Sequence, residues 1–307
     1  MSAASVLAAV SPERRRERLH GLAWLVWRQH RFLAWLLLGV VLLTVGYLVL
    51  QRFEFQSDLN AYAAKGCTIG QGAVNCGGVD NGLYSEEDVW SHLLDLLLLG
   101  PLLIGVFAGA ASFAGDFESG RDKLLWSQST EPRRWLAYRL VLPATAVVLG
   151  ATAIALTNTW YWDWSRPDFP VTEWWDRTTF GISGPLYPTA ALFALLLGAV
   201  CGLVLRRVVA AIAATGIMYL VVILAVNTYV PRLAWPAHTT PGVMGTPQSA
   251  WLFQLSMVMP WDRGSLVSSY QPASHFWMLE FIEAGVLLLL SAALVAFAFR
   301  WIRRLSV

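Results

Sequence analysis

The chain has 307 residues, of which 56% are hydrophobic and only 14% are charged, and its formal net charge is +2. Soluble domains carry about 25% charged residues, so this composition excludes an ordinary soluble protein and predicts a membrane protein. The sequence contains no Gly-x-x-x-x-Gly-Lys-Ser/Thr motif, the loop that holds nucleotide phosphates in many ATPases. We therefore do not expect the chain to hydrolyse ATP or to act as an enzyme by itself.

The first element that the sequence predicts is an amphipathic helix over 18–31. Apolar residues alternate there with Arg18 and Arg28, and Trp24 and Trp27 lie among them. This pattern is typical of a helix that lies in the membrane interface and leads into the first span as an elbow. The alternative is a simple extension of the first span.

Six apolar runs are long enough to cross a bilayer, which takes about 20 residues. Lys and Arg are frequent before the first run, between the second and third, and after the sixth, and the short connection between the fourth and fifth consists of Arg206 and Arg207, whereas the much longer alternate connections hold only two each. Because basic residues are enriched on the cytoplasmic side, we expect a single all-α polytopic domain in the cytoplasmic membrane with both termini in the cytoplasm. The predicted spans are 32–50, 93–113, 140–159, 186–205, 208–230 and 281–299.

The predicted outer loop 51–91 contains two cysteines, Cys67 and Cys76, in the glycine-rich stretch GCTIGQGAVNCGG. On the oxidising side of a membrane, two nearby cysteines favour a disulfide that closes a small hairpin. A pair of free thiols is the alternative. No further His or Cys stands at ligand spacing, so we predict no metal site.

The stretch Trp160–Trp175 carries five tryptophans. Tryptophan concentrates where headgroups meet hydrocarbon, so an aromatic belt is the favoured interpretation and a ligand cage the other.

The predicted outer loop 231–278 includes the apolar run SAWLFQLSMVMPW (Ser249–Trp261), which is too short to span. We predict a re-entrant or interfacial helix here, either as part of an outer gate or as a plain interfacial anchor.

A few polar side chains lie within the predicted spans, near their outer ends. Ionisable groups in a membrane indicate function by default, yet near the interface they can be solvated or pair with a base such as Arg232 or Arg263. Structural pairing is the favoured interpretation, and a gate, substrate or proton function is the alternative. The residues are His92, Asp95, Glu280 and Glu283.

The most informative segment is 114–138, a charged stretch between the second and third spans. It combines an apolar patch at Leu124, Leu125 and Trp126 with a rim of charged residues. Apolar anchors inside a polar rim are typical of a protein interface. The alternative is that these charges only set the membrane topology.

Four blocks now carry a family resemblance, and they extend over essentially the whole chain. They are AWLVWRQHR (Ala23–Arg31), PLLIGVFAGA (Pro101–Ala110), DFESGRDKLLWSQSTEPRRWLAYR (Asp116–Arg139) and YQPASHFWMLEFIEAG (Tyr270–Gly285). The chain resembles a permease subunit of the ABC-2 type of ABC transporter, in the group common in actinobacteria. Related sequences usually have an Arg-Glu pair where this chain has Gly115 and Asp116, and Thr where it has Arg121.

The resemblance implies an ATP-driven exporter that moves a hydrophobic or amphipathic substrate by alternating access. It implies two copies of a separate ATPase, which bind ATP and Mg, and a second permease copy, either identical or a close paralogue; we expect no cofactor on this chain and no nucleic-acid partner. Alternatives are a sensor or immunity subunit that recruits an ATPase, or a secondary transporter. The residues implied in ATPase coupling are Asp116, Glu118, Arg121, Leu125, Trp126, Gln128, Arg133, Arg134 and Trp135.

Overall fold

The computed structural model describes residues 13–66, 89–120, 132–165, 174, 176–233, 238–241, 251–258 and 265–305. Within these ranges, six helices are long and apolar enough to cross a membrane, which confirms the predicted all-α polytopic fold with six spans. They are Ala34–Ala61, Val89–Glu118, Arg133–Ser165, Leu186–Leu205, Val208–Leu233 and Ala273–Arg304.

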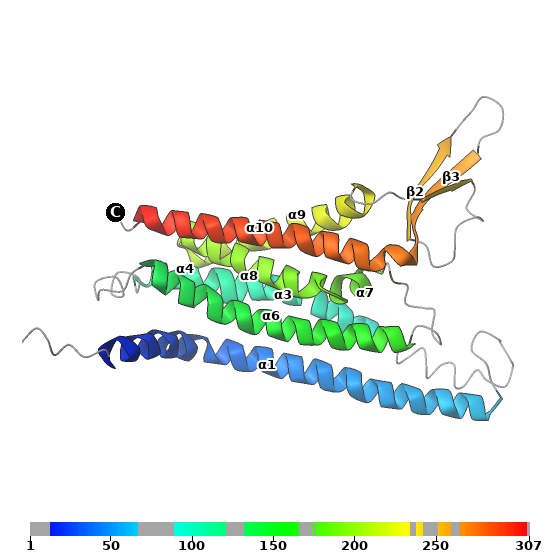
Figure 1. Cartoon of the computed structure of the whole chain (residues 1–307), viewed down its shortest axis with the longest axis horizontal. Helices are drawn as coiled ribbons and strands as arrows, with labels where there is room; N and C mark the ends of the chain where they lie inside the picture. The colour runs from blue at the N-terminus through cyan, green and yellow to red at the C-terminus, as the bar shows by residue number, and fades with distance from the viewer. Residues whose placement is uncertain are drawn as a thin grey trace, which may run out of the picture.

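The spans run side by side along the long axis of the molecule, with the C-terminus at one end and a small β-sheet at the other (Figure 1). Exposed arginines mark the end that holds the C-terminus. We call it the basic end, and the opposite end the sheet end. The arginines that define the basic end are Arg133, Arg134, Arg206, Arg207, Arg300 and Arg304.

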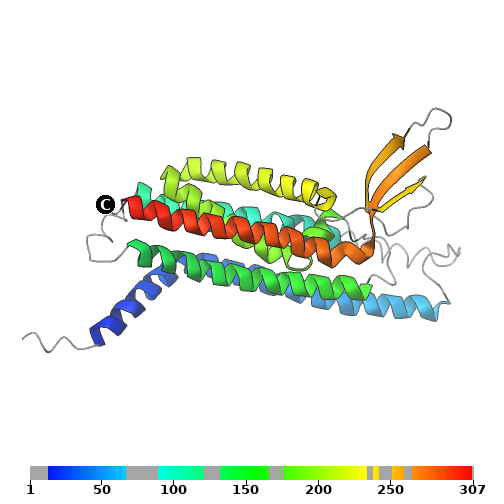
Figure 2. The ribbon, with the colours of Figure 1, turned by 45° about the horizontal axis from the view of Figure 1, so that its top comes forward.

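The first span is part of one continuous helix, α1 (Glu13–Ala64), 52 residues long. The predicted elbow over 18–31 is therefore continuous with the span that follows it, because the helix contains no proline that would break it. Figure 2 shows that the helix bends within its darkest blue part. At its other end α1 continues well past the predicted end of the span at 50.

The long helix of the third span, α6 (Pro132–Ser165), packs against α1, including the part of α1 that continues past residue 50. The guanidinium carbon of Arg52 lies 4.0 Å from the ring centre of Trp160 and 5.0 Å from that of Trp164. A cation over aromatic faces is attracted by their negative charge, so this contact holds the two helices together at the sheet end.

The second span changes its helix type along its length. It is helical over 89–98, is interrupted at Leu99, and resumes as α3 (Gly100–Leu103). It then continues as the π-helix η3 (Ile104–Ala111) and ends as α4 (Ser112–Glu118). The interruption coincides with Pro101, whose ring removes a backbone donor, as expected for a proline inside a helix.

The fourth span, α8 (Leu186–Leu205), is the centre of the bundle: 67% of its most apolar stretch is buried, against 17–39% in the other five. It packs against η3, α6, α9 (Val208–Leu233) and α10 (Phe276–Leu305). At the crossing with η3, a Cβ added to Gly198 would collide with the carbonyl of Gly105 and the amide of Ala110. Glycine therefore allows the two backbones to touch, as small residues do in membrane helix pairs.

The segment before the last span is a three-stranded antiparallel sheet rather than a re-entrant or interfacial helix. It consists of β1 (His238–Pro241), β2 (Trp251–Val258) and β3 (Ser265–Gln271) in the order β1-β3-β2. The run that was expected to be helical therefore forms β2, because β3 pairs with it along its length except at a register shift between Leu252 and Gln254. The sheet projects away from the start of α10, at the end of the molecule that α1 also reaches (Figures 1 and 2).

Gln271, the last residue of β3, anchors this sheet to the bundle. Its side-chain nitrogen donates to the carbonyl of Pro231 at 3.2 Å, and its oxygen lies 2.5 Å from Nδ1 of His275. The short helix η4 (Ala273–His275) then leads into α10. The sheet is thereby attached to the end of α9 and to the start of α10.

Candidate functional site

A buried ion pair joins the end of the second span to the start of the third at the basic end. Arg139 Nη2 on α6 lies 2.6 Å from Asp116 Oδ2 on α4, with the side chains 4% and 3% exposed. The same nitrogen donates to the carbonyl oxygen of Ser112 at 2.9 Å and to its hydroxyl oxygen at 3.3 Å. These contacts fix α4 against α6 on both sides of the segment 121–131.

Aromatic rings enclose the ion pair. Trp135 meets Phe113 and Phe117 edge to face, with ring centres 6.2 and 6.3 Å apart. The guanidinium carbon of Arg139 lies 5.3 Å from the ring centre of Phe113 and 5.6 Å from that of Trp135. The rings exclude water from the charges and attract the cation, so the pair acts as a single rigid unit.

The same region also contacts the short connection between α8 and α9. Glu118, the last residue of α4, accepts a hydrogen bond at 3.0 Å from the backbone amide of Val208, the first residue of α9. A carboxylate at this position complements the partial positive charge of a helix N-terminus. Arg206 takes a left-handed conformation at the turn, and its guanidinium lies 5.5 Å from the ring centre of Phe117.

Gly120 ends this part of the chain with φ +69°, a conformation that favours glycine. The carbonyl of Gly115 accepts both the backbone amide of Ser119 at 3.1 Å and the hydroxyl of Ser119 at 2.7 Å. The helix therefore ends at Glu118, and the described residues end at Gly120, just before the segment 121–131.

The predicted coupling residues fall into three groups in the structure. Asp116 and Trp135 are buried in the unit described above, and Glu118 contacts α9. Arg133 and Arg134 are exposed on the first turn of α6. The remaining predictions, Arg121, Leu125, Trp126 and Gln128, lie outside the described residues, as do Cys67 and Cys76.

Sequence reasoning missed the residues that hold this unit together, above all Arg139. In the sequence Arg139 counts only as one more basic residue between two spans. The signal that was present is its position two turns inside a helix that enters the membrane, where an unpaired arginine is costly and demands a partner.

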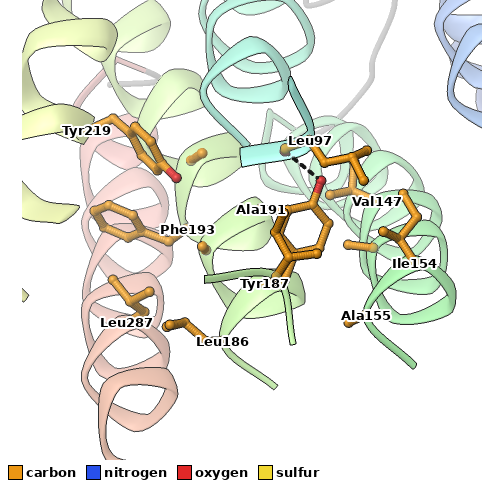
Figure 3. Close-up of a cluster of buried hydrophobic side chains, with 14 of the residues drawn as sticks. Leu97, Val147, Ile154, Ala155, Leu186, Tyr187, Ala191, Phe193, Tyr219 and Leu287 are labelled. Carbon is orange, nitrogen blue, oxygen red and sulfur yellow. Dashed lines mark hydrogen bonds between the residues drawn. The ribbon is translucent and has the colours of Figure 1, made fainter. Parts of the chain in front are cut away.

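A second polar contact lies deep in the bundle, at the interruption of the second span. Because Pro101 has no N–H, the carbonyl of Leu97, four residues earlier, loses its helical partner. The hydroxyl of Tyr187 on α8 donates to this carbonyl at 2.9 Å (Figure 3). A Cβ on Gly100 would lie 2.8 Å from that hydroxyl, so the glycine leaves room for the tyrosine.

The polar residues predicted near the outer ends of the spans do not form one cluster. His92 and Asp95 have exposed side chains on the second span, whereas Glu280 and Glu283 are fully buried on α10. Pairing with a base was expected, but within the described ranges no ion pair joins either glutamate to a basic side chain; Arg232 is exposed and Arg263 lies outside those ranges. Nor do any three His, Cys, Asp or Glu in the described part of the chain gather as metal ligands would.

The tryptophans of the predicted belt have more than one environment. Trp160 is partly exposed and carries the Arg52 contact, whereas Trp162 and Trp174 are buried. Trp174 packs with Phe180, Trp251 and Phe276 at ring-centre distances of 5.7–6.4 Å. This cluster forms a buried aromatic layer between the bundle and β2.

Comparison with known protein families places a match over most of the membrane-spanning part of the chain. A model of the family described as ABC-2 membrane transporter related matches residues 38–231, nearly two thirds of the chain. No curated protein and no solved structure matches the chain.

Proposed function

The chain belongs to the ABC-2 membrane transporter related family, and from that premise we propose that it is the permease subunit of an ATP-driven exporter. The observation that carries this proposal is the anchored segment at the basic end. The Asp116–Arg139 ion pair fixes the bundle on both sides of the charged segment 121–131. A partner protein that binds this segment would therefore move the second and third spans together.

In this proposal the basic end faces the cytoplasm, and both termini lie on that side of the cytoplasmic membrane. The exposed arginines at this end support the orientation, because positive residues flanking spans are retained in the cytoplasm. A cytoplasmic ATPase then has direct access to Arg133, Arg134 and the segment 121–131. ATP and Mg bind to that ATPase, and this chain catalyses no reaction itself.

A movement of the segment 121–131 would be transmitted to the bundle through three sets of contacts. The ion pair makes α4 and α6 move together, and the Glu118–Val208 hydrogen bond carries the movement to α9. Helix α4 continues into η3, which packs against the central helix α8. ATP binding can bias the bundle between inward-open and outward-open states only through contacts that differ between them, and these contacts are our candidates.

The assembly we propose contains two ATPase subunits and a second permease copy. The outward faces of α1 and α9 carry large exposed apolar side chains, which suit lipid or another permease. A substrate that crosses the membrane along such apolar surfaces would be hydrophobic or amphipathic.

The test combines purification with reconstitution. The wild-type chain, purified from its native membrane, should carry an ATP-hydrolysing subunit, and vesicles containing the complex should move a fluorescent phospholipid probe on addition of ATP. Replacing Trp126 with alanine and Arg133 and Arg134 with glutamate should abolish both, with membrane insertion unchanged. Arg300→Glu, a charge reversal at the same end but on α10, is the matched control.

The outcomes separate the alternatives. A wild-type chain that carries no ATPase would contradict the proposal. A bound ATPase without ATP-dependent movement of the probe would instead indicate a sensor or immunity subunit. Full activity in the triple variant would overturn the assignment of the segment 121–131 as the ATPase contact.

A further inference from the structure

Two carboxyl groups lie buried in the half of α10 that is nearer the sheet end. Glu280 and Glu283 are about 4.5 Å apart along the helix axis, at a rise of 1.5 Å per residue. Neither has any exposed surface (0% for both), and they share the inward face of α10 with Leu279 and Leu287. Figure 3 shows Leu287, one turn beyond Glu283, beside Leu186 of α8 in the apolar core.

The two carboxyl groups differ in their partners. Glu280 Oε2 accepts a hydrogen bond from the backbone amide of Leu186 at 3.1 Å. Its other oxygen and both oxygens of Glu283 have no hydrogen-bond partner in the described part of the chain. Glu283 is therefore a fully buried carboxyl group without a donor to stabilise its charge.

The elements that pack against α10 do not supply that donor. The hydroxyl of Tyr187 on α8 donates to the carbonyl of Leu97, and Arg232 at the end of α9 is exposed. None of the titratable or charged side chains on these elements, over their described residues, makes an ion pair or hydrogen bond with Glu283. They are Tyr187 and Cys201 on α8, Tyr219, Tyr229 and Arg232 on α9, Arg133, Arg134, Tyr138, Arg139, Tyr161 and Asp163 on α6, His275 on η4, and Arg177 on α7 (Arg177–Ile182), which packs on α10 through Phe180 and Phe276.

From this geometry we propose that Glu283 is a proton-binding site, occupied in the conformation described above. An ionised carboxylate without a partner in an apolar interior costs several kcal/mol, and a bound proton removes that cost. With no exposed surface, Glu283 has no adjoining space for water or a metal cation. The neighbouring Glu280 adds to the effect, because two carboxylates one turn apart on the same helix face repel each other when both are charged.

The site links the opening of the sheet end to proton release. In any conformation that admits water to Glu283, the carboxyl group can ionise, whereas in the closed conformation it keeps its proton. Closing therefore takes up a proton, so low pH favours the closed conformation and rising pH favours the open one. For one linked proton the ratio of open to closed changes by up to about tenfold per pH unit. This inference does not depend on ATP-driven transport.

Infrared spectroscopy of the full chain in lipid nanodiscs tests the bound proton directly. At neutral pH the wild type should show the carbonyl stretching band of a protonated carboxylic acid, and Glu283→Gln should remove it or reduce it. Asp95→Asn, which changes an exposed carboxylate, should leave the band unchanged. A wild type without the band, or a band unaffected by Glu283→Gln, would overturn the proposal.

Hydrogen exchange tests the linkage to opening. Exchange in peptides covering 183–191 and 276–290 is measured from about pH 6 to about pH 9, and each wild-type value is divided by that of Glu283→Gln at the same pH, so that the intrinsic pH dependence cancels. The ratio should rise with pH. A ratio independent of pH would contradict the linkage. Glu283→Met, which also has no proton to release, replaces the glutamine variant if that variant does not fold.

Discussion

At the basic end Arg139 neutralises Asp116 across 2.6 Å, whereas at the sheet end no basic side chain among the described residues pairs with Glu280 or Glu283. Both regions bury carboxyl groups almost completely. They differ in what compensates the charge: an arginine and aromatic rings at one end, and a single backbone amide at the other.

Because of this difference, one end of the bundle is held rigidly by a paired charge, whereas the packing of the other end responds to pH. A paired charge holds two helices together at any ordinary pH, because neither partner gains from separation into the apolar interior. An unpaired carboxyl group instead makes the packing around it depend on a proton.

Arg139→Met should destabilise the chain far more than Glu283→Gln. The first variant leaves Asp116 as an uncompensated buried charge, which costs about 3–5 kcal/mol. The second replaces an unpaired carboxyl group with a neutral amide of similar shape, and its cost should stay below about 1 kcal/mol. Thermal and denaturant unfolding in the same detergent measures both free energies.

Arg300→Met, at an exposed arginine of the basic end, is the control for Arg139→Met and should be nearly neutral. The double variant Asp116→Leu with Arg139→Met should recover part of the lost stability, because it removes both charges. Equal effects of Arg139→Met and Glu283→Gln would break the contrast between the two ends.

Tyr187→Phe probes the region between the ends. It should lower the free energy of unfolding by about 1–3 kcal/mol, because the carbonyl of Leu97 is left without a donor at the proline break. Unfolding under the conditions used for Arg139→Met measures the loss. Tyr229→Phe removes a hydroxyl from an exposed tyrosine and should change little. Equal losses of stability in both variants would show that the hydrogen bond from Tyr187 to Leu97 does not stabilise the bundle.

Glu118→Gln gives the smallest effect and tests how the basic end holds α9. The amide oxygen can still accept from Val208, but the negative charge at the helix N-terminus is lost, at a cost of about 0.3–1 kcal/mol. Faster hydrogen exchange in the first turn of α9 is the expected observation. Glu54→Gln, at an exposed position of α1, controls for loss of charge alone. Unchanged exchange in Glu118→Gln would remove this link from the proposed route.

The six spans could be predicted because each depends on local sequence. The partner of Asp116 could not. Arg139 comes after an intervening charged segment, and only the packing of α4 on α6 brings the two side chains together. The burial of Glu283 was missed for the same reason, since its depth depends on how α10 lies against α8.

The strand β2 was mistaken for a helix for a different reason. Its apolar composition and length fit a short membrane-associated helix as well as a strand, and periodicity does not separate the two in so short a run. The run forms a strand because β3 pairs with it from Ser265 to Gln271. The sequence alone contains no sign that these two runs are partners.

The central position of α8 also bears on the order in which the molecule is assembled during synthesis. Its neighbours η3 and α6 precede it in the chain, so the core can form as soon as α8 leaves the ribosome. The two-residue turn at Arg206 and Arg207 lets α9 follow as the second arm of a hairpin. Helix α10 comes after all of these elements in the chain, so Glu280 and Glu283 can be buried only once it packs against the surface that they already form.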